Sequence, residues 1–438
     1  DEMSSKPIKA PPVKIELRSD KKIVPKRISV ARPYPVHYRK EAAEKIRQLE
    51  ADGIIEKVSE ATEWSSPAFF VVKEAKPGEK QTKTKLRFVT DFSELNKYIA
   101  RPIWPFQCGL SIVNSIEPGN RFWAKLDCLQ GYHQLELEEE SSKLTTFLVE
   151  SGRYRYRRLP MGASMSSDHF CRITDEALED LPQRKLIDDI VTFDPTAAGL
   201  KQKIEDILIR CREKGITLSR KKFEVGGEIN FAGFILDVNG SRPDPERVSA
   251  LANFPRPKNL AQLRSFIGLV QTFNNFSPDI AHLTAVLRPL MSTKMTFNWL
   301  PEHTTAFEKL KAAMTSEMNV SFFDITRPTV LFTDASKVPG ALGYGLCQVK
   351  EDGNLTLIQC GSRACVPAEK NYAIIELECK AIEYALEKCR HFVYGCPSFE
   401  IRTDHRPLLG VFAKNLDEVK NDRLRSYREH CMDYNFEL

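Results

Sequence analysis

The chain has 438 residues, of which 42% are hydrophobic and 28% are charged, and its formal net charge is +5. This length and balance predict a soluble, globular protein of roughly two to four domains. It contains no run of about 18 apolar residues, so we expect no membrane-spanning segment and no membrane partner. The 11 cysteines are scattered without a C-x-x-C pair, which argues against a zinc site and a disulfide framework and indicates a reducing compartment.

Residues 1–38 form a basic, proline-rich leader that is predicted to be extended. Residues 1–40 hold 11 Lys or Arg and 4 Asp or Glu, so the positive charge of the chain is concentrated at this end. This leader is either a segment that contacts phosphate groups or a solvated tail, and the sequence favours neither interpretation.

Residues 39–240 alternate predicted helices and short strands, which indicates a mixed α/β or α+β region. A helix over 39–57 places Ala43, Ile46 and Leu49 on one face. The predicted strands are 68–73, 85–91, 121–127, 146–158, 185–193 and 230–236, the later helices are 166–180 and 198–214, and the basic stretch 74–84 is predicted to be a mobile hairpin.

The pattern changes after Gly240. Residues 241–322 lose strand alternation and are predicted to be helical. Residues 323–438 combine strands at 329–334 and 398–404 with a long helix at 374–389. Residues 432–438 alternate apolar and polar side chains, which predicts a half-buried strand that runs off the end of the sequence in a truncated domain.

Two acids lie between apolar runs at residues 186–191 (LIDDIV). The simplest structure is a β-hairpin between buried strands with Asp188 and Asp189 near its turn, although an ordinary Asp-rich turn is the alternative. Asp127 ends a separate apolar strand. Carboxylates paired at the edge of a core are costly unless a cation neutralises them. Acids from two strand ends therefore favour a Mg²⁺ site, and two such ions about 4 Å apart suit phosphoryl transfer.

The motifs around these acids identify a family. The chain resembles the reverse transcriptase and RNase H region of gypsy-type LTR retrotransposon Pol polyproteins over nearly all of residues 30–438. Seven segments in register carry the resemblance: 64–68 (WSSPA), 87–96 (RFVTDFSELN), 127–134 (DCLQGYHQ), 159–164 (LPMGAS), 186–189 (LIDD), 215–219 (GITLS) and 231–234 (FAGF).

The resemblance implies a role for each matching polymerase residue. Asp127, Asp188 and Asp189 would be catalytic and would bind Mg²⁺, with Mn²⁺ as an alternative ion. Tyr132 would crowd a ribose 2′-hydroxyl. Arg87 would bind the triphosphate, because the geometry of a guanidinium suits phosphate oxygens. Its companion would be Lys85, with Lys83 as the alternative. The implied nucleotide-binding residues are Arg87, Lys85, Tyr132, Met161 and Gly162.

The segment FAGF resembles the family's primer grip, formed by Phe231, Ala232, Gly233 and Phe234, although a plain core strand explains its apolar pattern equally well. Lys222 stands where a lysine would protonate pyrophosphate.

Two positions depart from the family pattern. Leu186 replaces the usual aromatic residue beside the acids, and Met161 stands where an aromatic residue or Gln is usual. Primer contact and nucleotide discrimination are the properties these departures affect.

A second set of acids lies in the last segment. Asp334 and Asp404 end strands, and Glu378 lies on the predicted helix, with Glu376 as its rival. Residues 371–379 (NYAIIELEC) and 403–408 (TDHRPL) resemble the RNase H domain of the same elements, which implies that these acids bind Mg²⁺ and cut RNA. The family has a fourth acid beyond a strand like 432–438, so we expect the nuclease to be incomplete in this chain.

The predicted fold class is an α+β right-hand polymerase with fingers, palm and thumb, followed by an α/β RNase H-like domain. The predicted divisions are a leader (1–38), fingers and palm (39–240), a helical thumb-like segment (241–322) and the RNase H-like domain (323–438). The resemblance implies an RNA template, a DNA primer, RNA–DNA hybrid and dNTPs as partners, a homodimer as one arrangement, and a cytoplasmic location within virus-like particles. A non-catalytic structural subunit of a reverse transcriptase dimer is the alternative, and the presence of the acids argues against it.

Overall fold

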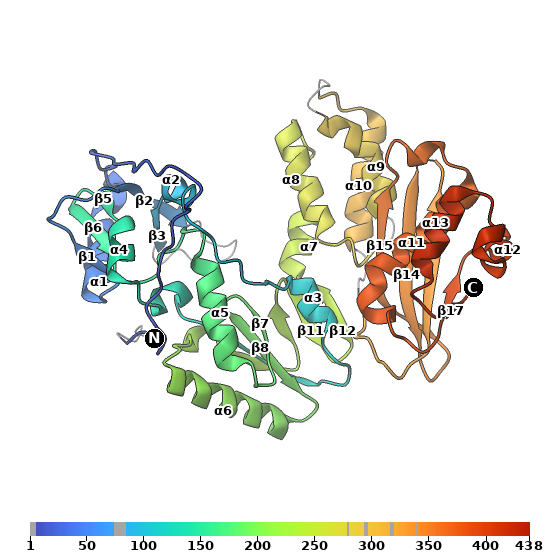
Figure 1. Cartoon of the computed structure of the whole chain (residues 1–438), viewed down its shortest axis with the longest axis horizontal. Coiled ribbons are helices and arrows are strands. Elements are labelled where there is room, and N and C mark those ends of the chain that lie inside the picture. The colour runs from blue at the N-terminus through green and yellow to red at the C-terminus, as the bar shows by residue number, and fades with distance from the viewer. Residues whose placement is uncertain (1–5, 74–84, 278–279, 293–296, 316–318, 339) are drawn as a thin grey trace. The chain divides into compact units, whose positions relative to one another are not determined.

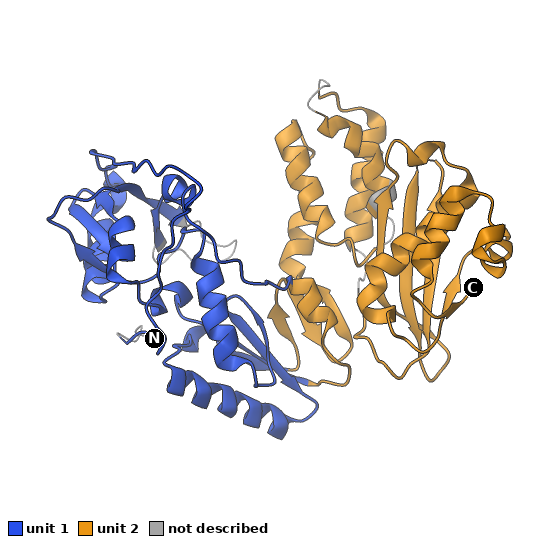
Figure 2. Ribbon diagram, viewed as in Figure 1, with its two compact units in different colours: residues 1–108, 122–226 blue, residues 109–121, 227–438 orange. Residues whose placement is uncertain are grey.

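The computed structural model describes residues 6–73, 85–277, 280–292, 297–315, 319–338 and 340–438. They form two compact units, unit 1 from residues 1–108 and 122–226 and unit 2 from residues 109–121 and 227–438 (Figure 2). The predicted hairpin over 74–84, and Lys83 with it, lies outside the described residues. Residues 227–240, which the sequence grouped with the palm, belong to unit 2 by their contacts. The four domain divisions stay predictions.

Unit 1 contains two β-sheets with helices packed against them (Figure 1). Its strands are β1 (Ile55–Lys57), β2 (Ser66–Lys73), β3 (Lys85–Thr90), β4 (Phe122–Asp127), β5 (Phe147–Val149), β6 (Gly152–Tyr156), β7 (Arg184–Leu186), β8 (Asp189–Asp194) and β9 (Glu224–Gly226). Its helices are α1 (Arg39–Ala51), α2 (Ser93–Asn96), α4 (Glu139–Leu144), α5 (Ser166–Leu178) and α6 (Ala197–Lys214), with 3₁₀ turns at η1 (Val36–Tyr38), η2 (Gly131–Gln134) and η3 (Arg220–Lys222). The first sheet has the order β1-β6-β5-β2-β3 and the second β7-β8-β4-β9.

Local sequence signals fix the helix that supports the second sheet. The Thr196 side chain caps the first turn of α6 by accepting from the Gly199 N–H at 3.0 Å. The helix ends at Gly215, whose φ of +77° suits a residue without a Cβ atom. Between these ends α6 packs on β4 and β8, the two strands that carry the predicted acids.

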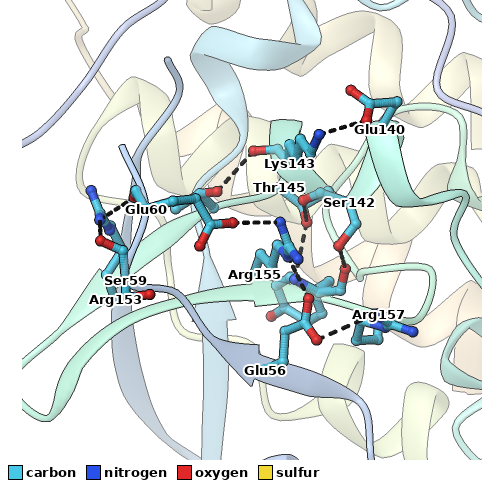
Figure 3. Close-up of polar contacts among 12 residues, drawn as sticks. Glu56, Ser59, Glu60, Glu140, Ser142, Lys143, Thr145, Arg153, Arg155 and Arg157 are labelled. Atoms are coloured by element: carbon cyan, nitrogen blue, oxygen red, sulfur yellow. Dashed lines mark hydrogen bonds and ion pairs between the residues drawn. The ribbon is translucent and has the colours of Figure 1, made fainter. Parts of the chain in front are cut away.

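An ion-pair network ties β1 to β6 in the first sheet (Figure 3). Glu56 lies opposite Arg155 in the strand register and accepts from its Nε at 2.5 Å, while Glu60 accepts from its Nη1 at 2.9 Å. Arg157 binds the second oxygen of Glu56 at 3.3 Å. The Arg155 side chain is only 12% exposed, so these carboxylates neutralise a largely desolvated guanidinium.

Part of the leader contributes to the core of unit 1, so the expectation of a solvated tail was wrong for residues 6–18, whereas residues 19–27 are exposed. Ile8, Val13 and Ile15 are buried in the core cluster of this unit. The backbone of residues 6–18, which we call the strap, bonds to distant segments, for example from the Ile8 N–H to the Gln134 carbonyl and from the Lys9 N–H to the Lys214 carbonyl, both at 2.8 Å. Apolar side chains between the lysines drive this packing, and net charge does not reveal it.

Two smaller expectations differ from the structure. On α1 the buried residues are Ala42, Ile46 and Leu49, whereas Ala43 is half-buried. Strand β7 is half-buried along its length, whereas β8 has a buried centre. The edge position of β7 in its sheet accounts for this difference.

Unit 2 holds a small three-stranded sheet, a helical segment and a five-stranded sheet (Figure 1). Its strands are β10 (Ile229–Phe231), β11 (Phe234–Asp237), β12 (Gly240–Pro243), β13 (Thr329–Ser336), β14 (Ala341–Val349), β15 (Leu355–Ala364), β16 (Phe399–Arg402) and β17 (Phe436–Glu437). Its helices are α3 (Gly109–Asn114), α7 (Pro245–Ala252), α8 (Leu260–Gln271), α9 (Ile280–Leu287), α10 (Pro301–Thr315), α11 (Ile374–Val393), α12 (Pro407–Ala413) and α13 (Asp422–Cys431), with 3₁₀ turns at η4 (Arg288–Met291), η5 (Glu369–Asn371) and η6 (Leu416–Glu418). The orders are β10-β11-β12 and β15-β14-β13-β16-β17.

The long helix α11 packs on β13, β14 and α13. Strands β13, β14 and β15 form an antiparallel meander, and β16 joins β13 in parallel. The strand predicted over 432–438 is limited to β17, because α13 continues to Cys431 and a turn follows, closed by the Tyr434 N–H and the Cys431 carbonyl. None of the helices in the described part of the chain is long and apolar enough to cross a membrane.

Replacing Ile15 by Ala tests whether the strap is part of the fold. Ile15 is 5% exposed, so the variant should lower the free energy of unfolding by about 2–5 kcal/mol. Chemical denaturation measures the change. The neighbouring exposed residue provides the control, since Lys14→Ala should change stability by no more than about 0.5 kcal/mol. Equal, small effects of both variants would show that the strap does not stabilise unit 1.

Candidate active sites

The first acid site lies where β4 meets the β7–β8 hairpin. Asp127 is opposite Asp189 in the β4–β8 register, and Leu186 is opposite Asp189 in the β7–β8 register. Ile187 and Asp188 therefore form a two-residue turn between the strands. The Cys128 N–H donates to the Asp188 carbonyl at 2.9 Å, which ties this turn to the end of β4.

The turn is strained. Ile187 has a φ of +57°, a left-handed conformation that β-branched residues avoid. Such a residue costs about 1–3 kcal/mol and persists only where its surroundings hold it. The hairpin thus presents Asp188 and Asp189 at the cost of local strain, as sites of chemistry often do.

Two lysine side chains face these acids. The Lys222 Nζ atom donates to both carboxylate oxygens of Asp127, at 2.9 and 2.8 Å, and the Nζ of Lys125 lies 3.6 Å from Asp189. Burial raises the pKa of Asp189, and the charges of Asp188 and Asp127 raise it further, while Lys125 opposes them. Burial alone would lower the pKa of Lys222, but the hydrogen bond to Asp127 and the charges of these acids together outweigh this effect, so the pKa of Lys222 is raised.

These residues fit a divalent cation. Asp127 is 4% exposed and its carboxylate is occupied by an ammonium group, so this buried charge requires a cationic partner. The donors are carboxylate oxygens, the ligands that hard cations such as Mg²⁺ prefer. The Lys222 ammonium therefore occupies the position beside Asp127 where a metal cation would bind.

Three of the predicted nucleotide-binding residues line one cavity. Arg87, Met161 and Gly162 lie in the wall of a cavity of about 720 Å³ in unit 1. Arg87 is exposed on β3, and Met161 is 44% exposed. Gly162 has a φ of +93°, and a Cβ atom there would lie 3.3 Å from the Thr90 carbonyl, so the backbone passes closely at this point.

Other cavity residues were missed by sequence reasoning. Gln130, His133 and Tyr156 also line it, with His133 stacked on Tyr156 and near the Gln130 amide oxygen at 3.2 Å. Burial lowers the pKa of His133 to about 4. Only the place of Gln130 and His133 inside the segment 127–134 signalled them, because their approach to Tyr156 depends on tertiary packing.

Tyr132 stands apart from this cavity. Its half-buried ring lies edge-on to Phe170 at 5.6 Å, and its hydroxyl and that of Ser167 are 2.8 Å apart. Burial raises the pKa of Tyr132. Among the described residues Tyr132 is a fixed ring beside the acids and not a member of the cavity wall. The remaining predicted nucleotide-binding residue, Lys85, opens β3 opposite Lys73 in the backbone register.

The segment 231–234 is a tight hairpin and not a plain core strand. Phe231 pairs with Phe234 across it, and Ala232 and Gly233 form its turn with φ of +55° and +84°. Two positive φ values in sequence define the primed turn that suits a two-residue hairpin. A Cβ atom at Gly233 would lie 2.1 Å from the Arg247 guanidinium carbon, so a cationic side chain packs directly on this turn.

The second acid site lies in unit 2. Asp334 on β13, Glu378 on α11 and Asp404 after β16 place one carboxylate oxygen each within 4.8 Å of the others. In the described residues this is the one set of three potential metal ligands drawn so close, and the acids of the first site do not approach one another to this extent. Glu378 is 3% exposed and its Oε2 atom has no hydrogen-bond partner, so the triad fits a cation that would complete it.

The environments of the two helix glutamates separate their roles. Burial raises the pKa of Glu378 to about 7, and the charges of Asp404 and Asp334 add to the effect. Glu376 instead closes the first turn of α11 and accepts from Asn421 and Arg423. Burial alone would raise the pKa of Glu376, but these hydrogen bonds outweigh burial, so the pKa is lowered. The structure thus brings Glu378, and not Glu376, to the two aspartates.

The fold around the two acid sites corresponds to that of a palm domain and an RNase H-like domain. Residues 75–236 match the family of reverse transcriptases (RNA-dependent DNA polymerases), and residues 299–401 match the RNase H-like domain found in reverse transcriptase. Over most of its length the chain is similar to the Pol polyproteins of gypsy-type LTR retrotransposons, in agreement with the predicted resemblance and fold class.

Individual relatives give the scale of the similarity. The chain is 29% identical over 423 residues to the Pol polyprotein of the transposon opus from Drosophila melanogaster, covering 93% of this chain and 41% of that protein. It is 30% identical to the gypsy polyprotein of the same organism, covering 87% and 37%. A foamy viral protease-reverse transcriptase, solved in complex with RNA/DNA hybrid, shares the fold with a TM-score of 0.80 at 21% identity, covering 100% of this chain and 58% of that one. The chain thus spans about two fifths of the length of these curated relatives.

The raised pKa of Glu378 predicts a pH-dependent stability. The folded chain holds this proton up to about pH 7, whereas the unfolded chain releases it above about pH 4.5. Stability should therefore fall as the pH rises through this window. Glu378→Gln should remove this fall, and Mg²⁺ should stabilise the wild type above pH 7 but not the variant. Thermal denaturation from about pH 4.5 to about pH 8, with and without Mg²⁺, measures both effects.

The neighbouring glutamate provides the contrast. Glu376→Gln should lower stability, because Arg423 loses its partner, and it should leave the response to Mg²⁺ intact. A wild-type pH slope shared by Glu378→Gln would contradict the assignment of the raised pKa.

Proposed function

We propose that the chain is the RNA-directed DNA polymerase of an LTR retrotransposon, also able to copy DNA, with an RNase H domain that degrades the RNA of RNA–DNA hybrids. The observation that carries the proposal is the register of β4 and β8, which sets Asp127 opposite Asp189 with Asp188 in the adjoining turn. The family matches support it, and so does the fold shared with an enzyme solved on RNA/DNA hybrid.

In this proposal Asp127, Asp188 and Asp189 would hold Mg²⁺, with Mn²⁺ as the alternative. When bound, such ions would supply electrostatic stabilisation of the charge that develops in phosphoryl transfer. Lys222 neutralises Asp127 beforehand. Its side chain is 62% exposed, so it is free to swing from Asp127 and to give a proton to the departing pyrophosphate.

The substrates follow from the remaining residues. Arg87 would bind the triphosphate of a dNTP at the cavity it shares with Met161 and Gly162. Tyr132, held by Ser167 and Phe170, would exclude a 2′-hydroxyl.

The strands being copied would be held elsewhere in the chain. The 231–234 hairpin would contact the DNA primer paired to an RNA template. Binding of the hybrid should be mainly electrostatic and therefore weakened by salt. In the RNase H-like domain Asp334, Glu378 and Asp404 would hold Mg²⁺ beside the RNA strand.

A non-catalytic structural subunit is the second candidate. The acids argue against it, because a supporting subunit has no need for a strained turn that brings carboxylates together. A homodimer and a cytoplasmic location within virus-like particles belong to this proposal on the family resemblance alone. Light scattering of the purified chain tests the first of these.

Primer extension on an RNA template tests the polymerase proposal. The wild type should extend a DNA primer with dNTPs and Mg²⁺, and Asp188→Asn should lose about 10²–10³-fold in rate, because a metal-holding charge is removed. The exposed acid of α6 offers a control, since Glu213→Gln should extend normally. An inactive wild type would favour the structural subunit, and full activity of Asp188→Asn would mean that the acids are misassigned.

Sugar discrimination tests Tyr132. Tyr132→Ala should raise incorporation of rNTPs relative to dNTPs, because the ring that fills the 2′-hydroxyl position is gone. Tyr132→Phe is the matched control: it loses the contact with the Ser167 hydroxyl but keeps the ring, so it should discriminate like the wild type. The measurement is the ratio of kcat/KM for the two nucleotides. An unchanged ratio in Tyr132→Ala would remove this residue from the site.

A further inference from the structure

A buried lysine supports the strained turn from inside the unit. The Lys185 side chain lies on β7, two residues before the turn residue Ile187, and is only 4% exposed. Its Nζ atom donates to the Ile187 carbonyl at 3.0 Å and pairs with Asp175 at 2.9 Å. A charged group this desolvated is kept only where its partners are fixed.

Helix α5 fixes those partners. The second oxygen of Asp175 accepts from the Trp104 indole at 2.7 Å, and the Trp104 N–H donates to Asp168 at 2.9 Å. Asp168 is fully buried at its side chain and also accepts from Arg101. Lys185 is thereby attached to α5 through Asp175, whose side chain is 38% exposed but is also held by the Trp104 indole.

The same helix reaches the nucleotide side of the site. Phe170 on α5 lies 5.7 Å from the Lys185 ammonium and meets the Tyr132 ring edge-on. Ser167, also on α5, meets the Tyr132 hydroxyl. One helix thus sets both the turn with the acids and the ring beside them.

We propose that Lys185 is a positioning residue for nucleotide addition: its bond to the Ile187 carbonyl holds the β7–β8 turn in the left-handed conformation and so fixes the carboxylates of Asp188 and Asp189 relative to Asp127. The inference rests on the polymerase function proposed above. Without this donor the turn is free to relax to an unstrained conformation. The acids then lose their shared geometry, and a shift of about 1 Å at a reacting centre costs up to about 100-fold in rate.

Variants at Lys185 test the bond itself. Lys185→Met keeps the length and apolar stem but has no donor, so it should lower kcat by about 10- to 100-fold and raise the Mg²⁺ concentration for half-maximal activity. The KM for dNTP should stay near the wild-type value, because Arg87 lies on another strand and in another sheet. Lys185→Gln retains an N–H donor and should recover part of kcat.

Two second-site variants separate positioning from stability. Lys185→Met with Asp175→Asn removes the carboxylate charge left behind, so it should regain thermal stability without regaining kcat. In an Ile187→Gly background the turn carries no strain, since glycine accepts positive φ, and Lys185→Met should then cost much less in kcat. Loss of kcat that follows the melting temperature in every variant, or that is equal in the wild-type and Ile187→Gly backgrounds, would overturn the proposal.

Metal binding provides a readout that does not need activity. Mn²⁺ titration of the chain carrying Asp334→Asn and Glu378→Gln reports on the unit 1 acids alone. Adding Lys185→Met should weaken this binding several-fold, and unchanged affinity would overturn the proposal. If the wild type fails to extend primers, the polymerase function fails, while the Mn²⁺ titration still decides whether Lys185 positions the acids.

Discussion

Burial of carboxylates at the adjoining ends of β4 and β8 is the constraint on which the site in unit 1 depends. Backbone register places Asp127 opposite Asp189, and burial, together with the charges of Asp188 and Asp127, raises the pKa of Asp189. Two ammonium groups compensate these acids: Lys222 binds Asp127, and Lys125 lies near Asp189. Sheet, turn and helix together hold the acids at a partly buried position, where a carboxylate requires a cationic partner.

The acids of unit 2 are stabilised in a different way from those of unit 1. Asp404 follows β16 and Asp334 lies within β13, which continues to Ser336 and not to the predicted end at Asp334; both acids are exposed, so water screens them, whereas Glu378 comes from the buried face of α11. Its Oε2 atom has no hydrogen-bond partner, and its raised pKa means that a proton substitutes for a cation near neutral pH. The first site is neutralised by lysines and the second by protonation. The two sites should therefore differ in how pH controls their occupancy by metal.

Sequence patterns predicted the elements that carry chemistry, because those elements are local. The pair of acids between apolar runs defines the β7–β8 hairpin, and α5 and α6 follow the predicted helices within a few residues. Patterns failed where distant segments decide the outcome. The strap was predicted to be either a phosphate contact or a tail, yet its apolar side chains lie in the core, and the alternation over 432–438 yields only the short β17. Neither outcome is encoded within the segment itself.

The amino-acid sequence by itself determined the family resemblance, the alternation of helices and strands, and which acids lie on or next to strands, since motif spacing and hydrophobic period are properties of the chain alone. Only the tertiary structure decided which acids meet. Glu376 and Glu378 lie on one turn of α11. Because α11 packs on β13, Glu376 pairs with Arg423 and Glu378 lies next to Asp334 and Asp404. The acids on the β7–β8 turn likewise owe their arrangement to Lys185 and α5, which no local pattern reveals. The register between strands and the burial of the carboxylates, more than the residue types alone, bring these acids together in a candidate metal site.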